Sequence, residues 1–286
     1  MRIFEPHAHM TSRTTDDYEA MASAGVKALV EPAFWLGQPR TSAGSFVDYF
    51  NSLLGWERFR ASQFGIRHHC TIGLNPKEAN DDVLRREVLA LLPRFLAKDG
   101  VVAVGEVGFD GMTGAEEEAL SIQLSMAEEH ELPVLVHTPH RDKLAGTRRT
   151  LELVEASGLR PEHVLIDHNN ELTAEEVHAS GCWVGFSIYP NTKMDEHRMA
   201  RILQEHGTDR MVINSACDWG VSDPLKVAKT AAAMRVAGFD EDDVDKVVWR
   251  NPVAFFAQSG RLILDELGER DLAATFAGNT LLRGER

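Results

Sequence analysis

The chain has 286 residues, of which 43% are hydrophobic and 26% are charged, a composition that fits a globular protein and excludes a disordered or fibrous one. Its 44 acidic and 30 basic residues give a net charge of −14, so we expect no strong binding of long nucleic acid. There is no apolar stretch long enough to cross a membrane and no signal sequence at the start, which predicts a cytoplasmic protein without a membrane partner.

Short β-rich runs alternate along the chain with longer segments in which apolar residues recur every three or four positions. The short runs predict eight strands: Arg2–Pro6, Val26–Pro32, Arg67–Leu74, Val101–Glu106, Pro133–His137, Val164–His168, Cys182–Ser187 and Arg210–Ser215. The longer segments predict helices: Asp81–Ala97, Glu116–Glu129, Asp142–Ser157, Thr173–Ser180, Asp195–His206 and Pro224–Ala237. This alternation predicts a parallel α/β sheet, and eight such units are expected to close into a (β/α)8 TIM barrel.

Residues that cap or interrupt helices predict where individual helices begin, bend or end. Thr173 has the spacing of a capping box with the acid three residues later, and Pro93 predicts a kink or break in its helix. Near the end of the chain, Asn251–Ala257 predicts a further helix with Asn251 as its N-cap.

The competing fold is an open, doubly wound sheet with a glycine-rich turn after the first strand. The sequence there is His7-Ala8-His9, which lacks the glycines and favours the barrel. We therefore expect one domain over residues 1–286, with the barrel at about residues 1–258 and a C-terminal helical extension at residues 259–286.

Six candidate metal ligands stand where predicted strands end, the end of a TIM barrel that carries its chemistry. They are His7, His9, Glu106, His137, His168 and Asp218. Each alone is more often structural, but their convergence from five strand ends indicates a metal site. Four imidazoles and two carboxylates suit zinc, manganese, iron or cobalt, and six ligands exceed one tetrahedral site, which predicts two ions that share a carboxylate. A carboxylate that remains free to hydrogen-bond the activated water would act as general base.

The order and spacing of these motifs resemble those of the TatD-like metal-dependent hydrolases of the amidohydrolase superfamily. The resemblance rests on His7-Ala8-His9, Gly105-Glu106, Pro133-Val134 with His137, His168, Asp218 and Asn251-Pro252. It implies a hydrolase with a (β/α)8 barrel and one or two divalent ions. By matched position, His7, His9 and Asp218 hold the first ion, His137 and His168 hold the second, and Glu106 bridges them. Asp218 would also carry the proton, so the implied catalytic residues are Asp218 and Glu106.

The expected pocket differs from that of the family's nucleases. Asn75 stands where those proteins tend to have a histidine, Arg141 lies two positions later than their arginine, and residues 215–220 replace their Glu-Thr-Asp-x-Pro motif. We therefore expect the metal site to be kept and the substrate to be a small molecule. Zinc is the first expectation for the ion, with manganese or magnesium as alternatives.

Loops at the same strand ends contain candidate substrate-binding residues. His140, Arg141 and Lys143 follow the fifth strand and suit an anionic group. Trp35 lies in the long loop after the second strand, a candidate lid that would stack on the substrate. Further candidates for the pocket are Asn75, Asn170, Glu31, Tyr189 and Lys193.

These observations favour a hydrolase that uses a metal-activated water on a small phosphoester or nucleotide-like substrate. Hydrolysis of a carboxylic amide, ester or lactone is the alternative within the superfamily. From other classes, a sugar or uronate isomerase and a non-catalytic metal-binding partner in a biosynthetic or export complex remain open. The presence of Asp218 argues against the non-catalytic partner, because a scaffold needs no proton shuttle.

Overall fold

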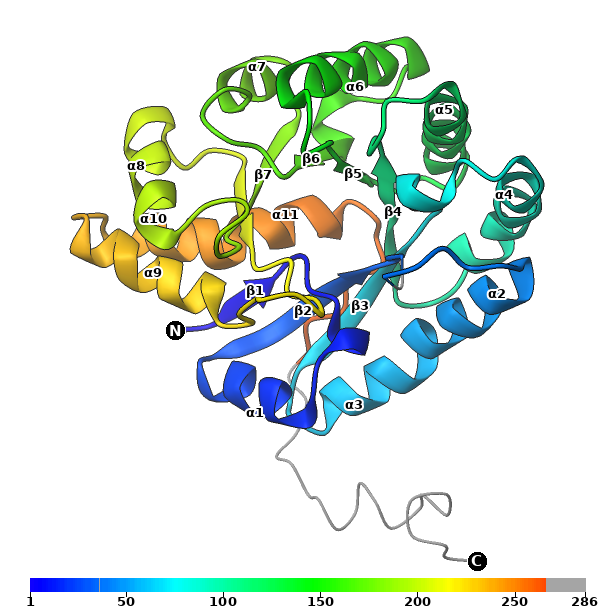
Figure 1. Ribbon diagram of the computed structural model, residues 1–286. Coiled ribbons are helices and arrows are strands. Elements are labelled where there is room, and N and C mark those ends of the chain that lie inside the picture. Colours follow the sequence, from blue (N-terminus) through cyan, green and yellow to red (C-terminus); the bar gives the residue numbers. More distant parts are fainter. Residues whose placement is uncertain (36, 266–286) are drawn as a thin grey trace, which may run out of the picture.

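The structure is a computed structural model that describes residues 1–35 and 37–265, and its eight parallel strands confirm the predicted TIM barrel (Figure 1). The strands pair in chain order, from β1 to β8. They are β1 (Ile3–Glu5), β2 (Val26–Pro32), β3 (Arg67–Ile72), β4 (Val101–Gly108), β5 (Val134–His137), β6 (Val164–Asp167), β7 (Trp183–Ser187) and β8 (Met211–Asn214). Each lies within two residues of its predicted bounds, because runs buried on both faces of a parallel sheet are nearly continuous in apolar residues.

Helices surround the strands, as Figure 1 shows. They are α1 (Thr15–Ser23), α2 (Ala43–Ser52), α3 (Arg58–Ser62), α4 (Asp82–Leu96), α5 (Gly114–Glu129), α6 (Lys143–Ser157), α7 (Ala174–Ala179), α8 (Glu196–His206), α9 (Lys226–Val236), α10 (Glu241–Asp245) and α11 (Asn251–Ala257). The first three were not predicted, α10 lies within the acidic run Asp240–Asp245, whose charges suit a helix start, and the others agree with the sequence analysis. Among the described residues, no helix combines the length and the apolar character that crossing a bilayer requires.

Several local predictions differ from the structure. Helix α4 continues through Pro93, so the predicted break does not occur. Pro93 itself is exposed, whereas Leu92 and Phe95 of the same turn are buried in the core. Thr173 makes no capping bond: its hydroxyl accepts from the Asn170 backbone amide and donates to Oδ1 of Asn169 instead. Asn251 is no N-cap: a π-helical turn joins α10 to α11 without a break, and the Asn251 amide donates to the Met211 carbonyl. Residues 259–265 form no helix, and the rest of the predicted extension lies outside the described residues.

Apolar side chains fill the barrel interior at the end where the strands begin. Phe4 stacks on Phe256 with ring centroids 5.8 Å apart, and Phe255 meets Phe256 edge-on at 4.9 Å. These rings belong to one buried cluster with inward side chains of β2, β4, β5, β6 and β8. Helix α11 supplies two of the rings and contacts β1, β4 and β8. Since this end is closed by apolar packing, polar side chains inside the barrel gather toward the opposite end.

The seam between the last strand and the first brings two predicted motifs together. Beyond the strand ends, the Ala216 amide donates to the His7 carbonyl at 2.9 Å, and the His9 amide donates to the Cys217 carbonyl at 2.8 Å. The buried carboxylate of Glu5 accepts hydrogen bonds from the backbone amides of His7 and Ser215, both at 3.1 Å. The His7-x-His9 segment therefore lies beside the segment that carries Asp218.

Candidate metal centre

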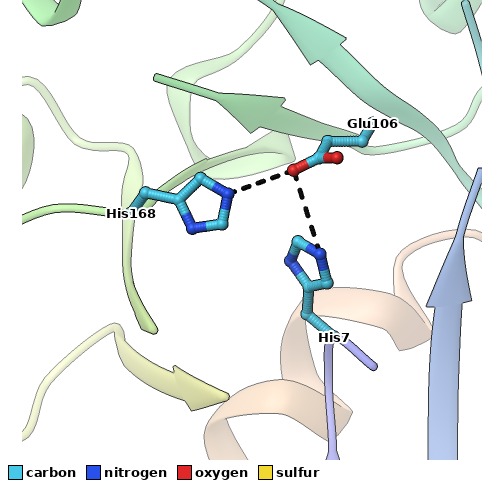
Figure 2. Close-up of side chains that lie close together, drawn as sticks. All are labelled: His7, Glu106 and His168. Atoms are coloured by element: carbon cyan, nitrogen blue, oxygen red, sulfur yellow. Dashed lines mark hydrogen bonds and ion pairs between the residues drawn. The ribbon is translucent and has the colours of Figure 1, made fainter. Parts of the chain in front are cut away.

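Three histidine nitrogens approach one carboxylate oxygen at the centre of the barrel mouth. Oε1 of Glu106 lies 2.9 Å from Nδ1 of His137, 3.1 Å from Nε2 of His168 and 3.8 Å from Nε2 of His7. Figure 2 shows His7 and His168 both directed at this oxygen, His168 from the left and His7 from below. His7, Glu106 and His168 form a buried group whose candidate ligand atoms all lie within 4.8 Å of one another.

The position of Glu106 follows from the close approach of β4 to β5. Gly108 has a φ of 132°, and a Cβ atom there would lie only 2.1 Å from the His137 carbonyl oxygen. A residue with a side chain would push the strands apart, so glycine lets Glu106 and His137 share one space. On its other side, Oε2 of Glu106 accepts a hydrogen bond of 3.0 Å from Nδ2 of Asn75. Oε1 is thereby left facing the histidines.

A buried polar network beneath the centre orients the rings of His7 and His168. Nδ1 of His7 lies 2.7 Å from Oδ2 of Asp167, whose two carboxylate oxygens also accept from the amide of Asn214. The Ser187 hydroxyl donates to Oδ1 of Asn214 and lies 2.6 Å from Nδ1 of His168. Partners of this kind set which ring nitrogen carries the proton, and here they leave Nε2 of both rings facing Glu106.

Two residues of the site have backbone conformations that L-amino acids rarely adopt. His168 has a φ of 63°, and Ala216, two residues before Asp218, has a φ of 42°. Non-glycine residues in this region cost free energy and tend to cluster where a side chain must be aimed for function. The hydrogen bonds from the His168 amide to Asp167 and from the Ala216 amide to His7 hold these conformations in place.

His9 and His137 each have one ring nitrogen without a hydrogen-bond partner in the part of the chain that the structure describes. Nε2 of His9 lies 3.0 Å from Nε2 of His7, and the His9 ring stacks on Phe34 at 3.8 Å. Nδ1 of His9 and Nε2 of His137 are buried and make no hydrogen bond among the described residues. Buried polar atoms are almost always paired, so the chemistry of these two imidazole nitrogens fits ligands of a cation.

Electrostatics at the centre also suit a divalent ion. Burial by itself would raise the pKa of Glu106, but His137, His168 and His7 outweigh it and hold that pKa well below its usual range. Burial, followed by the charge of Lys193, lowers the pKa of His168 far below that of free imidazole. Burial, followed by His7, does the same for His9. Burial by itself would lower the pKa of His7, but the hydrogen bond with Asp167 and the charges of Glu106 and Asp167 outweigh it and raise that pKa. The ionised Glu106 and the lowered pKa values of His9 and His168 suit a metal ion, which binds ionised carboxylates and neutral imidazoles.

Asp218 faces the same cavity but stands apart from the tight group. Its Oδ1 accepts hydrogen bonds from the Tyr189 hydroxyl at 2.7 Å and from the Gly220 amide at 2.8 Å. Its Oδ2 accepts none from the described residues. The guanidinium of Arg13 donates to the Asp218 carbonyl at 3.0 Å and so fixes this part of the loop. The position suits a carboxylate that handles a proton near the metal centre.

A cavity of about 370 Å³ opens above the centre. Trp35, His140, Lys77 and Tyr189 line it together with Asp218 and every candidate ligand except His7, and Asn170 lines a neighbouring cavity. Arg141, a predicted substrate-binding residue, is exposed and lines none of these cavities, because the chain turns outward before α6 begins.

The family assignment follows from comparison with known proteins. The family model described as TatD related DNase matches residues 5–257. The chain belongs to this family. The resemblance predicted from the strand-end motifs is thereby confirmed.

Relatives of this TatD-family chain carry the same kind of description. An uncharacterized metal-dependent hydrolase of Methanocaldococcus jannaschii is 25% identical over 89% of this chain and 99% of its own length. The crystal structure of a TatD-like protein from Archaeoglobus fulgidus is 27% identical, covers 88% of this chain and 99% of that one, and superimposes with a TM-score of 0.74. The TatD-family protein is therefore a metal-dependent hydrolase.

More distant structures share the fold alone. The phosphotriesterase homology protein from Escherichia coli, solved with phosphate in its active site, is 16% identical with a TM-score of 0.62, covering 89% of this chain and 98% of its own.

Sequence reasoning missed the residues that support the ligands of this TatD-family site. Asp167, Asn214 and Ser187 were not singled out, although each ends a buried strand with a polar residue. For Asp167 the sequence also offered a second signal, because this carboxylate stands directly before the candidate ligand His168. Asn75 was expected in the substrate pocket, but the structure places its amide on Glu106.

Proposed function

We propose that the protein hydrolyses a small phosphoester, with water as the nucleophile and zinc as the preferred ion. The observation that carries this proposal is the positive charge beside the centre in a protein of net charge −14. The ammonium group of Lys193 lies 2.8 Å from Nδ1 of His168 and makes no ion pair with a carboxylate of the described residues. Lys77 lines the same cavity, but its ammonium is paired with Oδ1 of Asp110 at 2.8 Å, so the unpaired charge beside the centre is that of Lys193. An anionic substrate is stabilised in such surroundings and a neutral one is not.

The buried group of His7, Glu106 and His168 would hold one ion, and the free nitrogens of His9 and His137 leave room for a second. A divalent ion held there lowers the pKa of water and polarises a phosphoryl oxygen.

The chain's own groups supply the remaining steps. Asp218 accepts a proton from the attacking water as the new phosphorus–oxygen bond forms. The bond between phosphorus and the leaving oxygen then breaks, and the same carboxyl returns the proton to the leaving alcohol. Lys193 offsets the negative charge that develops on the phosphoryl oxygens, and Tyr189 keeps the Asp218 carboxylate in place by donating to Oδ1. The products are an alcohol and a phosphate, with one water consumed.

The test is a substrate panel assayed separately with zinc, manganese and magnesium. The wild-type protein should release nitrophenol from 4-nitrophenyl phosphate or from bis(4-nitrophenyl) phosphate, and Asp218→Asn should reduce kcat by about a hundredfold or more. Asp99→Asn is the matched control, since Asp99 is exposed at the α4–β4 connection, the opposite end of the barrel. Turnover of a lactone or amide with no phosphoester activity would overturn the proposal and favour the carbonyl chemistry of the superfamily.

A further inference from the structure

A second cavity, of about 260 Å³, adjoins the metal centre. The two cavities share His140, His168 and Lys193 as lining residues. The second one also reaches Lys143 and Asn170, which follow β5 and β6. A group bound there would sit beside the substrate's reacting end and not on the metal centre itself.

The described lining of this cavity contains no carboxylate and three basic side chains, those of Lys143, Lys193 and Arg198. The charge is opposite to that of the whole protein, in which acidic residues outnumber basic ones by 44 to 30. Arg198 is neutralised by an ion pair with Glu171, whereas Lys143 and Lys193 have no carboxylate partner among the described residues.

Both lysines are held in position with hydrogen-bonding capacity to spare. The ammonium of Lys143 donates to the carbonyl and hydroxyl oxygens of Thr138, at 3.1 and 2.8 Å, and its third N–H has no partner among the described residues. The backbone of Lys193 is fixed by a hydrogen bond from Arg198 to its carbonyl. Burial, followed by the positive charge of Lys193, lowers the pKa of Lys143 to about 7. Both lysines line the same cavity, so an anion held there would face both side chains and favour the protonated form of Lys143.

Resting on the proposed phosphoester hydrolysis, we infer that this cavity binds a second anionic group of the substrate, a phosphate or a carboxylate, between Lys143 and Lys193. The side-chain amide of Asn170 lines the same cavity, and its Nδ2 has no hydrogen-bond partner among the described residues, so it is available as a further donor. The substrate class is then a small molecule with two separated anionic groups, of which one is attacked at the metal centre and the other is held.

The experiment measures binding of inorganic phosphate to the full-length protein after its metal has been removed, by isothermal titration calorimetry. Wild-type protein should bind phosphate, and Lys143→Met should weaken that binding by about tenfold while Lys143→Arg retains most of it. Lys98→Met is the matched control, because Lys98 is exposed near the opposite end of the barrel. Should Lys143→Met fail to fold, Asn170→Ala replaces it, with a smaller expected loss.

Equal anion affinity in wild-type protein and Lys143→Met would overturn the inference, as would a metal-free wild-type protein that binds neither phosphate nor acetate nor malonate. Asp218→Asn separates this result from the proposed function. Metal-free Asp218→Asn should bind phosphate like the metal-free wild type. The loss of turnover in Asp218→Asn tests the catalytic proposal alone. A carboxylate-only preference, with acetate or malonate binding in place of phosphate and the same loss in Lys143→Met, would assign the second group as a carboxylate.

Discussion

Replacing Asp167 by asparagine should weaken metal binding without changing any residue in the cavity. Asp167 is fully buried, and its Oδ2 lies 2.7 Å from Nδ1 of His7. Burial by itself would raise its pKa, but the neighbouring His168 and the hydrogen bond with His7 lower the pKa below that of a free carboxyl. The carboxylate is therefore ionised and accepts the proton of His7 Nδ1, which leaves Nε2 as a metal ligand.

The expected size of the effect follows from the hydrogen bonds that the substitution disturbs. Oδ1 accepts from the His168 amide at 2.7 Å, and both oxygens accept from Asn214. An asparagine amide has one oxygen for these donors, and its NH2 group must face another donor. Loss of such a support for a ligand histidine lowers metal affinity by about 10- to 100-fold, or about 1.4 to 2.8 kcal/mol. Loss of a charged hydrogen bond should also lower the free energy of unfolding by about 1.5 to 3 kcal/mol.

The assay titrates metal-free protein with zinc in competition with a chromophoric chelator, and urea unfolding is measured in parallel. The exposed Asp99→Asn, which also removes one negative charge, is the control. Zinc affinity equal to that of the wild type in folded Asp167→Asn would refute the role assigned to the His7–Asp167 pair.

Three further outcomes are expected. Removal of metal by a chelator should abolish turnover and lower the melting temperature, with both restored by added zinc; unchanged turnover would exclude a metal role. Burial raises the pKa of Glu31 to about 8 from 4.5, so the folded protein keeps a proton that the unfolded chain loses, and stability falls as pH rises between these values. Glu31→Gln should flatten that part of the urea-unfolding profile, while the exposed Glu87→Gln should not. Arg13→Lys should lower kcat by about tenfold, since only the guanidinium reaches both Asp17 and the Asp218 carbonyl. An unchanged kcat in steady-state kinetics would contradict this role of Arg13.

The strands were predictable because burial on both faces requires continuous apolar runs, a signal that each run carries by itself. Helices α1 to α3 were not recognised. Helix α3 has only five residues, and α2 begins in a glycine- and serine-rich stretch typical of a loop, although Phe46, Tyr49 and Phe50 repeat at helical spacing. Asn251 shows the opposite error: its sequence suits a helix start, but tertiary packing continues the helix through it.

The candidate ligands could be found from the chain alone, because a barrel gathers the ends of its strands at one mouth and His7, Glu106 and His168 each stand near such an end. Which groups support them could not. Asn75 contacts Glu106, and Asp167 contacts His7, across 31 and 160 residues of chain. These pairs depend on strand register and on the closing of the barrel, properties of the whole sheet that no single segment encodes.

The charge of the pocket was decided in the same way. Sequence composition determined that the protein as a whole is acidic, and local order placed Lys143 and Arg141 in one loop. Only the folded chain separates them, with Arg141 turned to solvent and Lys143 beside Lys193 in a cavity. The physical reason is that a net charge sums over the surface, whereas the field at a site depends on the few side chains that the fold brings within reach.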